Sequence, residues 1–207
     1  TRDVYVALGV QRETETKTNS KTGKPFEVAK RGKDNTASFK TLFADLDVKD
    51  GAYSTTEEAL DDVKKFAADY RLPEPNMIVA SGTGGLHVYW VLDRDIPAGE
   101  WYPLGLALAN AGLEYGLKFD SQCSYDFARI LRVPDTFNYK RGEPLPVRLI
   151  LCDDTDIPVE TMRDALARYI GKALPRSSGV ARDADEADPL FMGLERTARL
   201  RNIDDCL

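Results

Sequence analysis

Asp45 and Asp47 stand two residues apart at the end of an apolar segment, residues 39–48, that the pattern predicts to be a β-strand. Because side chains alternate along a strand, this spacing puts both carboxylates on one face. Two carboxylates held together repel each other, and their pKa values rise unless a cation relieves the repulsion. Mg²⁺ binds carboxylate oxygens together with substrate phosphate oxygens, so the pair predicts a divalent metal site. A solvated pair of acids at a strand end is the alternative.

A third carboxylate is expected further along the chain. Asp120 ends the short apolar run 117–120, which reads as another strand. Asp126 lies six residues later and is the rival candidate. Either residue has an alternative role as the cap of a helix or turn.

His87 is the only histidine in the chain, and it follows the glycine-rich segment 82–85. Backbone N–H groups in such a turn can form a concave anion site, so His87 and this turn are candidates for phosphate binding. A tight hairpin turn explains the glycines equally well, and a partly buried histidine bonded to its neighbours is also open. A single histidine excludes both a two-histidine metal site and a replication-initiator nuclease with a His-hydrophobe-His motif.

Basic residues surround residues 133–138. Arg129 and Arg132 lie three residues apart, which on a strand would point them to opposite faces, and Lys140 follows. The planar guanidinium of arginine suits bidentate contacts with phosphate. Surface ion pairs with nearby acids are the alternative.

Charge is unevenly distributed over the 207 residues, whose formal net charge is −6. Basic residues gather in residues 1–40 and 129–149, on either side of an acidic centre. This pattern suits carboxylates that hold metal ions beside groups that hold phosphates, although chance clustering on a solvated surface would look the same.

The composition favours a protein of the reducing cytosol. Three cysteines without C-x-x-C spacing argue against a disulfide framework and a structural zinc site. No apolar run approaches the roughly 20 residues of a membrane span, and no secretory signal opens the sequence. We therefore expect a cytoplasmic location and no membrane partner.

The elements that must position these residues alternate between strands and helices. Strands are expected at 4–10, 39–48, 77–81, 87–92, 127–133 and 147–151, with a basic loop or hairpin over 11–36 and a β-hairpin joining 77–81 to 87–92. Helices are expected at 56–70, behind a capping box formed by Ser54 and Glu57, at 98–115, and at 157–170 behind Asp156. The intermixed order predicts an α+β fold with a mostly antiparallel or mixed sheet.

The order of these motifs resembles the archaeo-eukaryotic primase superfamily, and most of all the primase-polymerase domains of phage and plasmid replication proteins. The resemblance covers roughly residues 4–150. It is carried by the paired acids, the glycine-rich turn before His87, the single acid and the R-x-x-R-x-P-x-T-x-N-x-K pattern that begins at Arg129.

The resemblance implies a fold and a reaction. The fold is an RRM-like catalytic half packed against an N-terminal α/β module, with C-terminal helices. The reaction is primer synthesis and extension on a single-stranded DNA template from nucleoside triphosphates, with two Mg²⁺ or Mn²⁺ ions. Asp45, Asp47 and Asp120 would be catalytic and hold the metal ions. The residues implied in nucleotide binding are Ser81, Gly84, Gly85, His87, Arg129, Arg132, Asn138 and Lys140, and Lys30, Arg31 and Lys33 would contact the template.

Two departures from the family pattern stand out. The family often has serine two residues before the histidine, where this chain has Gly85, and its Pro-Gly-Thr is here Pro134-Asp135-Thr136. A two-metal nuclease using the same acids and a non-catalytic RRM-like module that binds single strands through Tyr89 and Trp90 are the alternatives.

Three regions are expected along the chain. Residues 1–172 would form the catalytic domain, 173–188 a linker, and 189–207 a C-terminal helix that begins a further region. Because relatives are often fused to or associated with a helicase, we expect the natural protein to continue past residue 207.

Overall fold

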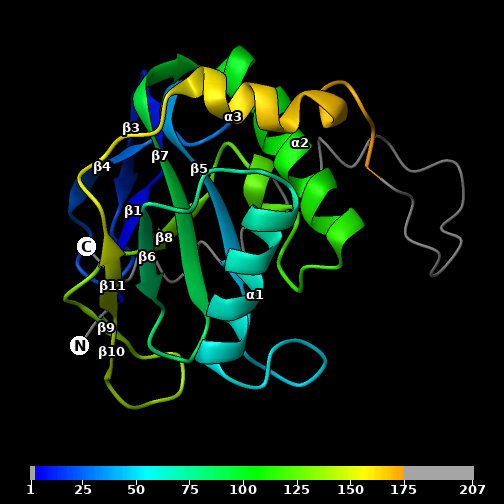
Figure 1. Cartoon of the computed structure of the whole chain (residues 1–207). Coiled ribbons are helices and arrows are strands. Elements are labelled where there is room, and N and C mark those ends of the chain that lie inside the picture. The colour runs from blue at the N-terminus through cyan, green and yellow to red at the C-terminus, as the bar shows by residue number, and fades with distance from the viewer. Residues whose placement is uncertain (1–2, 175–207) are drawn as a thin grey trace, which may run out of the picture.

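Figure 1 shows the computed structural model of the chain, which describes residues 3–174. Its main sheet has five strands in the order β11-β6-β7-β5-β2. They comprise Arg148–Cys152, Met77–Ala80, Leu86–Pro97, Thr36–Leu46 and Gly9–Gln11, respectively. Each neighbouring pair is antiparallel. Together with the helices, this sheet confirms the predicted α+β class.

Three α-helices pack on the central strands. Helices α1 (Thr56–Asp69) and α2 (Ala98–Tyr115) lie beside β5 and β7 in Figure 1. Helix α3 (Val159–Leu166) packs on α2 and β7 and continues into a 3₁₀ turn, Ala167–Tyr169. The core between these elements is aromatic: Phe39 of β5 stacks on Trp101 of α2 with ring centroids 3.6 Å apart. These large buried side chains hold β5 in place, and β5 carries Asp45.

The catalytic half predicted to be RRM-like has a compatible topology. Strands β5 and β6 are connected by α1 but do not pair; β7 lies between them and is antiparallel to both. This is a split β-α-β arrangement, as in ferredoxin-like and related folds. The glycine-rich segment forms the predicted turn of the β6–β7 hairpin, closed by the N–H of Ser81 on the carbonyl oxygen of Gly85 at 2.8 Å.

The N-terminal module is built from strands. Strand β1 (Tyr5–Ala7) pairs with β8 (Ile130–Arg132), and β3 (Thr14–Thr18) pairs with β4 (Pro25–Ala29). The second pair confirms a hairpin within the basic segment 11–36. Residues 3–35 contain β1, β2, β3 and β4.

Two short elements complete the region near the site. Strands β9 (Phe137–Asn138) and β10 (Leu145–Pro146) form a hairpin just before β11, and a 3₁₀ helix spans Cys123–Tyr125. The predicted strand at 117–120 is reduced to one bridge, between Phe119 and Leu46. This bridge nevertheless sets the segment that leads to Asp120 beside the end of β5.

Two predicted helix caps were misplaced. The cap of α1 is Thr55, whose side chain accepts the N–H of Glu58, while the Glu58 carboxylate accepts the N–H of Ser54. The capping box therefore lies one residue later than Ser54 and Glu57. Asp156 does not cap α3, which begins after Pro158; its carboxylate pairs with Lys40 at 3.0 Å. A proline ahead of the first turn suits a helix start because no N–H is lost.

The expected helix at 189–207 and all but the first two residues of the expected linker lie outside the described residues. None of the helices within residues 3–174 combines the length and the apolar character that crossing a bilayer requires.

Candidate active site

Asp45 and His87 face each other on neighbouring strands. They are direct partners in the antiparallel register of β5 and β7, with 3.9 Å between Asp45 Oδ1 and His87 Nε2. The imidazole is 4% exposed and the carboxylate 24% exposed. Since neighbouring residues in such a pair point to the same face of the sheet, the register alone brings the first acid and the lone histidine together.

The other two acids approach Asp45 from separate segments. Asp47 lies one residue beyond the end of β5. Asp120 follows α2 and donates its backbone N–H to the carbonyl oxygen of Asp45 at 2.9 Å. Both carboxylates raise the pKa of Asp45 by repulsion. The three acids that the sequence analysis identified therefore lie close enough together for their charges to interact.

Each flanking acid already has a cationic partner. Lys49 Nζ donates to Asp47 Oδ2 at 2.5 Å, and Arg129 Nη2 donates to Asp120 Oδ2 at 3.2 Å. Arg129 is also 3.6 Å from Asp126, through its Nε atom. Asp126, the rival third acid, thus shares the Arg129 guanidinium with Asp120 and also caps the turn by accepting the N–H of Ala128.

Burial sets the protonation of the central pair. It raises the pKa of Asp45 to about 6, and the nearby carboxylates of Asp47 and Asp120 add to this, whereas Arg129 and Arg132 oppose it. Burial lowers the pKa of His87 to about 4, and the same two arginines lower it further. At neutral pH His87 is therefore an uncharged imidazole with one N–H to donate.

Both arginines act on the same pair. Arg129 and Arg132 were expected on opposite faces of one strand, but β8 begins at Ile130, so Arg129 precedes the strand and the alternation does not apply to it. Arg132 is held by the N-terminal strand: its Nη2 donates to the Tyr5 hydroxyl at 2.9 Å, and its Nε is 3.5 Å from Asp3 Oδ1.

Three buried nitrogen atoms near the acids lack a hydrogen-bond partner: His87 Nδ1, Arg129 Nε and Arg132 Nε. The two guanidinium nitrogens nevertheless lie within ion-pair distance of carboxylates, at 3.6 Å from Asp126 and 3.5 Å from Asp3. Of the three atoms, His87 Nδ1 is therefore the one that a bound group could satisfy without breaking an ion pair.

The glycines of the turn permit close approach of two strands. A Cβ atom on Gly85 would lie 2.8 Å from the carbonyl oxygen of Leu46, so this position accepts no side chain without moving β5. Gly84 has a φ of +101°, which other residues rarely adopt. The family's serine is therefore excluded at Gly85 by the backbone that leads to Asp47.

Ser81, Asn138 and Lys140 are joined by structural contacts. Asn138 is fully buried; its amide donates to the Ser81 carbonyl oxygen at 2.6 Å and accepts the N–H of Lys140 at 2.9 Å. Ser81 is buried, with its hydroxyl 3.4 Å from that of Thr83. Asn138 thus holds the residue that precedes the glycine-rich turn. The Lys140 side chain is exposed.

The three residues expected to contact the template lie after β4. Lys30 and Lys33 are exposed. Arg31 donates to the carbonyl oxygen of Ala128 at 3.5 Å, next to Arg129. Arg31 therefore connects the segment after β4 to the loop that leads into β8.

The chemistry of the acids fits divalent metal ions. A buried carboxylate with a raised pKa beside two further carboxylates is stabilised by a cation, and Mg²⁺ typically uses one or two carboxylates plus water and substrate phosphate. In residues 3–174, no group of three or more His, Cys, Asp or Glu side chains is already arranged as a metal cage. When metal ions bind, the carboxylates of Asp47 and Asp120 would therefore have to give up their contacts with Lys49 and Arg129.

Four residues that shape the site escaped the sequence analysis. Lys49 pairs with Asp47, Asp3 and Tyr5 hold Arg132, and Tyr53 joins two of the acid-bearing segments. Asp3 lies just before β1 and Tyr5 begins it, and nothing in the sequence identifies Arg132 as their partner.

Comparisons with known proteins identify the fold. No protein-family model and no curated protein matches the sequence. Among solved structures, the archaeo-eukaryotic primase domain of the cyanophage S-2L primase-polymerase matches with a TM-score of 0.55 and 16% identity, over 79% of this chain and 70% of that one. The chain therefore has the fold of an archaeo-eukaryotic primase-type domain.

Two further solved structures are similar at a lower level. The polymerase domain of Mycobacterium tuberculosis ligase D, solved in complex with DNA, has a TM-score of 0.41 and 16% identity over 80% of this chain and 58% of that one. The primase RepB′ has a TM-score of 0.44 and 13% identity over 89% and 51%. At these scores the likeness carries no argument about this chain.

Proposed function

We propose that this chain is a template-dependent DNA primase or polymerase that forms and extends primers on single-stranded DNA by nucleotidyl transfer, in the cytoplasm during phage or plasmid replication. The observation that carries the proposal is the meeting of Asp45, Asp120 and His87, which come from three distant segments of the chain. Acids beside a phosphate-binding group are what phosphoryl transfer requires.

In this proposal Asp45, Asp47 and Asp120 hold Mg²⁺ or Mn²⁺. When bound, the two metal ions lower the pKa of the attacking 3′-hydroxyl and stabilise the leaving pyrophosphate. The remaining residues position the nucleoside triphosphate. Arg129 and Arg132 would supply positive charge, His87 would donate a hydrogen bond from a neutral imidazole, and the Gly84–Gly85 turn, packed against the end of β5, would offer backbone N–H groups.

Asn138 enters this scheme as a positioning residue. Its amide supports the Ser81 carbonyl oxygen at the start of the turn, so it would act on the triphosphate through the glycine-rich backbone. Lys140 remains exposed and free to move toward a phosphate. Lys30, Arg31 and Lys33 would lie along the template backbone, where contacts are electrostatic and weaken with salt.

The non-catalytic alternative finds little support in the aromatic residues. An RRM-like module binds single strands by stacking bases on exposed rings. Tyr89 is 3% exposed, and Trp90 is fully buried with its indole N–H on the carbonyl oxygen of Pro73. Neither ring offers a stacking surface.

Residues 1–172 are proposed as the catalytic domain, and a helicase as a fused or associated partner. A direct test incubates the purified chain with a labelled primer on a longer template, Mn²⁺ and nucleoside triphosphates. We expect the labelled strand to lengthen. A strand that shortens would support the two-metal nuclease, and unchanged strands with measurable DNA binding would support the non-catalytic module.

A further inference from the structure

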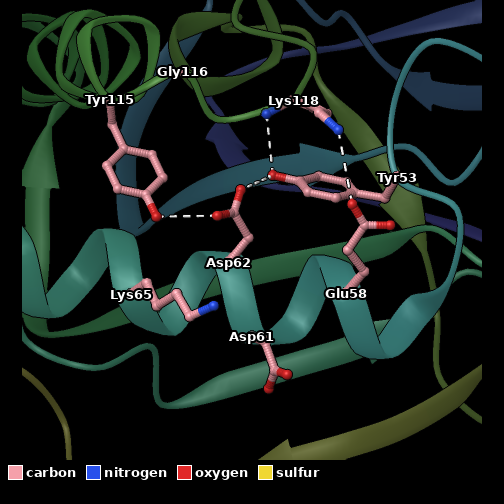
Figure 2. Close-up of a pocket in the computed structure, with 8 residues that line it drawn as sticks. All are labelled: Tyr53, Glu58, Asp61, Asp62, Lys65, Tyr115, Gly116 and Lys118. Carbon is pink, nitrogen blue, oxygen red and sulfur yellow. Dashed lines mark hydrogen bonds and ion pairs between the residues drawn. The ribbon is translucent and has the colours of Figure 1, made fainter.

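A polar cavity of about 590 Å³ lies beside the acids rather than at them. Figure 2 shows it between α1, which supplies Asp62 from below, and the end of α2, which supplies Tyr115. Tyr53 and Lys118 also line it, and in Figure 2 they lie next to each other, on the opposite side of Asp62 from Tyr115. The contacts across this cavity suggest a role in arranging the acids.

Asp62 is the centre of the network. One of its carboxylate oxygens accepts the Tyr53 hydroxyl at 2.5 Å, and the other accepts the Tyr115 hydroxyl at 3.0 Å. Burial and the Asp62 carboxylate raise the pKa of Tyr115 to about 12 and also raise that of Tyr53. Both phenols therefore stay protonated and donate to Asp62 over the whole physiological range.

The backbone of Tyr53 holds the segment of Asp47. Its N–H approaches the carbonyl oxygen of Asp47 at 3.4 Å, and its carbonyl oxygen accepts the N–H of Lys49 at 3.1 Å. Residues 47–53 thus form a loop that is closed by backbone hydrogen bonds between its two ends. The position of Tyr53 fixes where Asp47 and its partner Lys49 leave the sheet.

The side chain of Tyr53 holds the segment of Asp120. Its hydroxyl oxygen accepts the backbone N–H of Lys118 at 3.1 Å, two residues before Asp120. The Lys118 side chain returns over the Tyr53 ring at 5.3 Å and donates to the carbonyl oxygen of Ala52 at 3.2 Å. Tyr53 is 1% exposed, so the link is shielded from water.

We propose that Tyr53, oriented by Asp62, is a positioning residue that sets the distance between Asp47 and Asp120 and thereby the affinity of the acids for divalent metal ions. The inference rests on the proposed function. Asp62 orients the hydroxyl so that its lone pair faces Lys118. Tyr115 shares the carboxylate but touches neither acid-bearing segment through its hydroxyl, so it provides a matched control.

The test compares Tyr53→Phe with Tyr115→Phe. Each variant removes one hydroxyl from the same carboxylate, but only Tyr53→Phe removes the acceptor of the Lys118 N–H. Mn²⁺ affinity is measured by titration calorimetry without DNA or nucleotide, and amide hydrogen exchange is followed over residues 47–53 and 117–120. Outer partners of metal ligands typically change metal affinity by about 10–100-fold when removed.

We expect Tyr53→Phe to weaken Mn²⁺ binding about tenfold and to speed amide exchange at Lys118, with Tyr115→Phe close to the unmodified protein. If Tyr53→Phe weakens Mn²⁺ binding no more than Tyr115→Phe does, this inference is wrong, while the proposed function stands provided that the unmodified chain binds Mn²⁺ and extends primers. If the unmodified chain binds no Mn²⁺, the proposed function fails and the inference falls with it.

Discussion

Asp45 Oδ1 lies 3.9 Å from His87 Nε2, across two strands whose register makes these residues direct partners. Burial favours the neutral form of each side chain, so it raises the pKa of Asp45 and lowers the pKa of His87. At neutral pH Asp45, with a pKa of about 6, is largely ionised at a cost that a bound cation relieves, while His87 stays uncharged. This is a suitable ground state for a site that binds metal and phosphate together.

Replacing Asp45 by asparagine should lower the primer-extension activity but raise the stability of the fold. Asp45→Asn should reduce primer extension by roughly 100-fold or more, because a metal ligand is lost. At pH 8 the free energy of unfolding of the same variant should exceed that of the unmodified protein by about 1–3 kcal/mol, because the substitution removes a buried charge. Its unfolding temperature should rise accordingly.

The pH dependence of that difference follows from the pKa of Asp45, which is raised from 3.8 to about 6. The stability linked to its protonation is fully present below the unfolded pKa and is lost as pH rises through about 6. The advantage of Asp45→Asn should therefore shrink from pH 8 to pH 4 in thermal unfolding without metal. An advantage that stays constant over this range would contradict the burial argument.

The lone histidine can be observed directly by NMR. With ¹³C-labelled histidine, the single imidazole signal should titrate near pH 4, because burial disfavours the imidazolium. The stability from the neutral ring is fully present above the unfolded pKa near 6.5 and is lost as pH falls through about 4. A midpoint at or above 6.5 would mean that His87 is solvated or paired with an ionised Asp45.

Asp120 and Asp126 should differ sharply when each is replaced by alanine. Asp120→Ala should lose extension activity by roughly 100-fold or more, as for Asp45. Asp126→Ala should lose less than about tenfold, since it removes no proposed metal ligand; it removes the acceptor of the Ala128 N–H and a partly exposed ion pair to Arg129 worth about 1 kcal/mol. Primer-extension rates for both variants decide the matter, and the reverse order would make Asp126 the third ligand.

Lys49 should compete with metal for Asp47. Lys49→Met removes the ammonium group 2.5 Å from that carboxylate and should raise Mn²⁺ affinity up to about fivefold, the scale of an exposed ion pair. Lys64→Met, on the exposed face of α1, is the matched control and should leave the affinity unchanged. Equal titration curves for the two variants would show that Lys49 does not stand in the way of the metal ion.

Template binding should depend on salt through the basic segment after β4. Lys30→Ala combined with Lys33→Ala should lower the slope of log affinity against log salt by about 1.4 for single-stranded DNA, or about 0.7 per phosphate contact. Lys40→Ala, whose ammonium group pairs with Asp156, is the control. An unchanged slope in a filter-binding or anisotropy series would remove these lysines from the template path.

Local patterns were readable from the sequence, and long-range partners were not. Apolar runs predicted the strands at 39–48 and 87–92, helical spacing of apolar residues predicted α1, and a long apolar segment predicted α2. The capping box slipped by one residue because Ser54 and Thr55 stand before two consecutive glutamates, so two boxes were possible.

In the candidate site, too, the residue types could be predicted from the sequence but their contacts could not. Its acids and His87 were identified by residue type and spacing, but their meeting depends on the β5–β7 register and on the N–H of Asp120. The roles of Tyr53 and Asn138 depend on partners 65 and 57 residues away, respectively. Contacts at that separation are created by the tertiary fold, and periodicity carries no information about them.

The β1–β8 pairing ties the start of the described chain to one arm of the site, since Asp3 and Tyr5 both hold Arg132. The placement of this guanidinium therefore depends on residues more than 120 positions earlier in the sequence. A substitution at Tyr5 would alter the charge around Asp45 and His87 without touching any of the three acids.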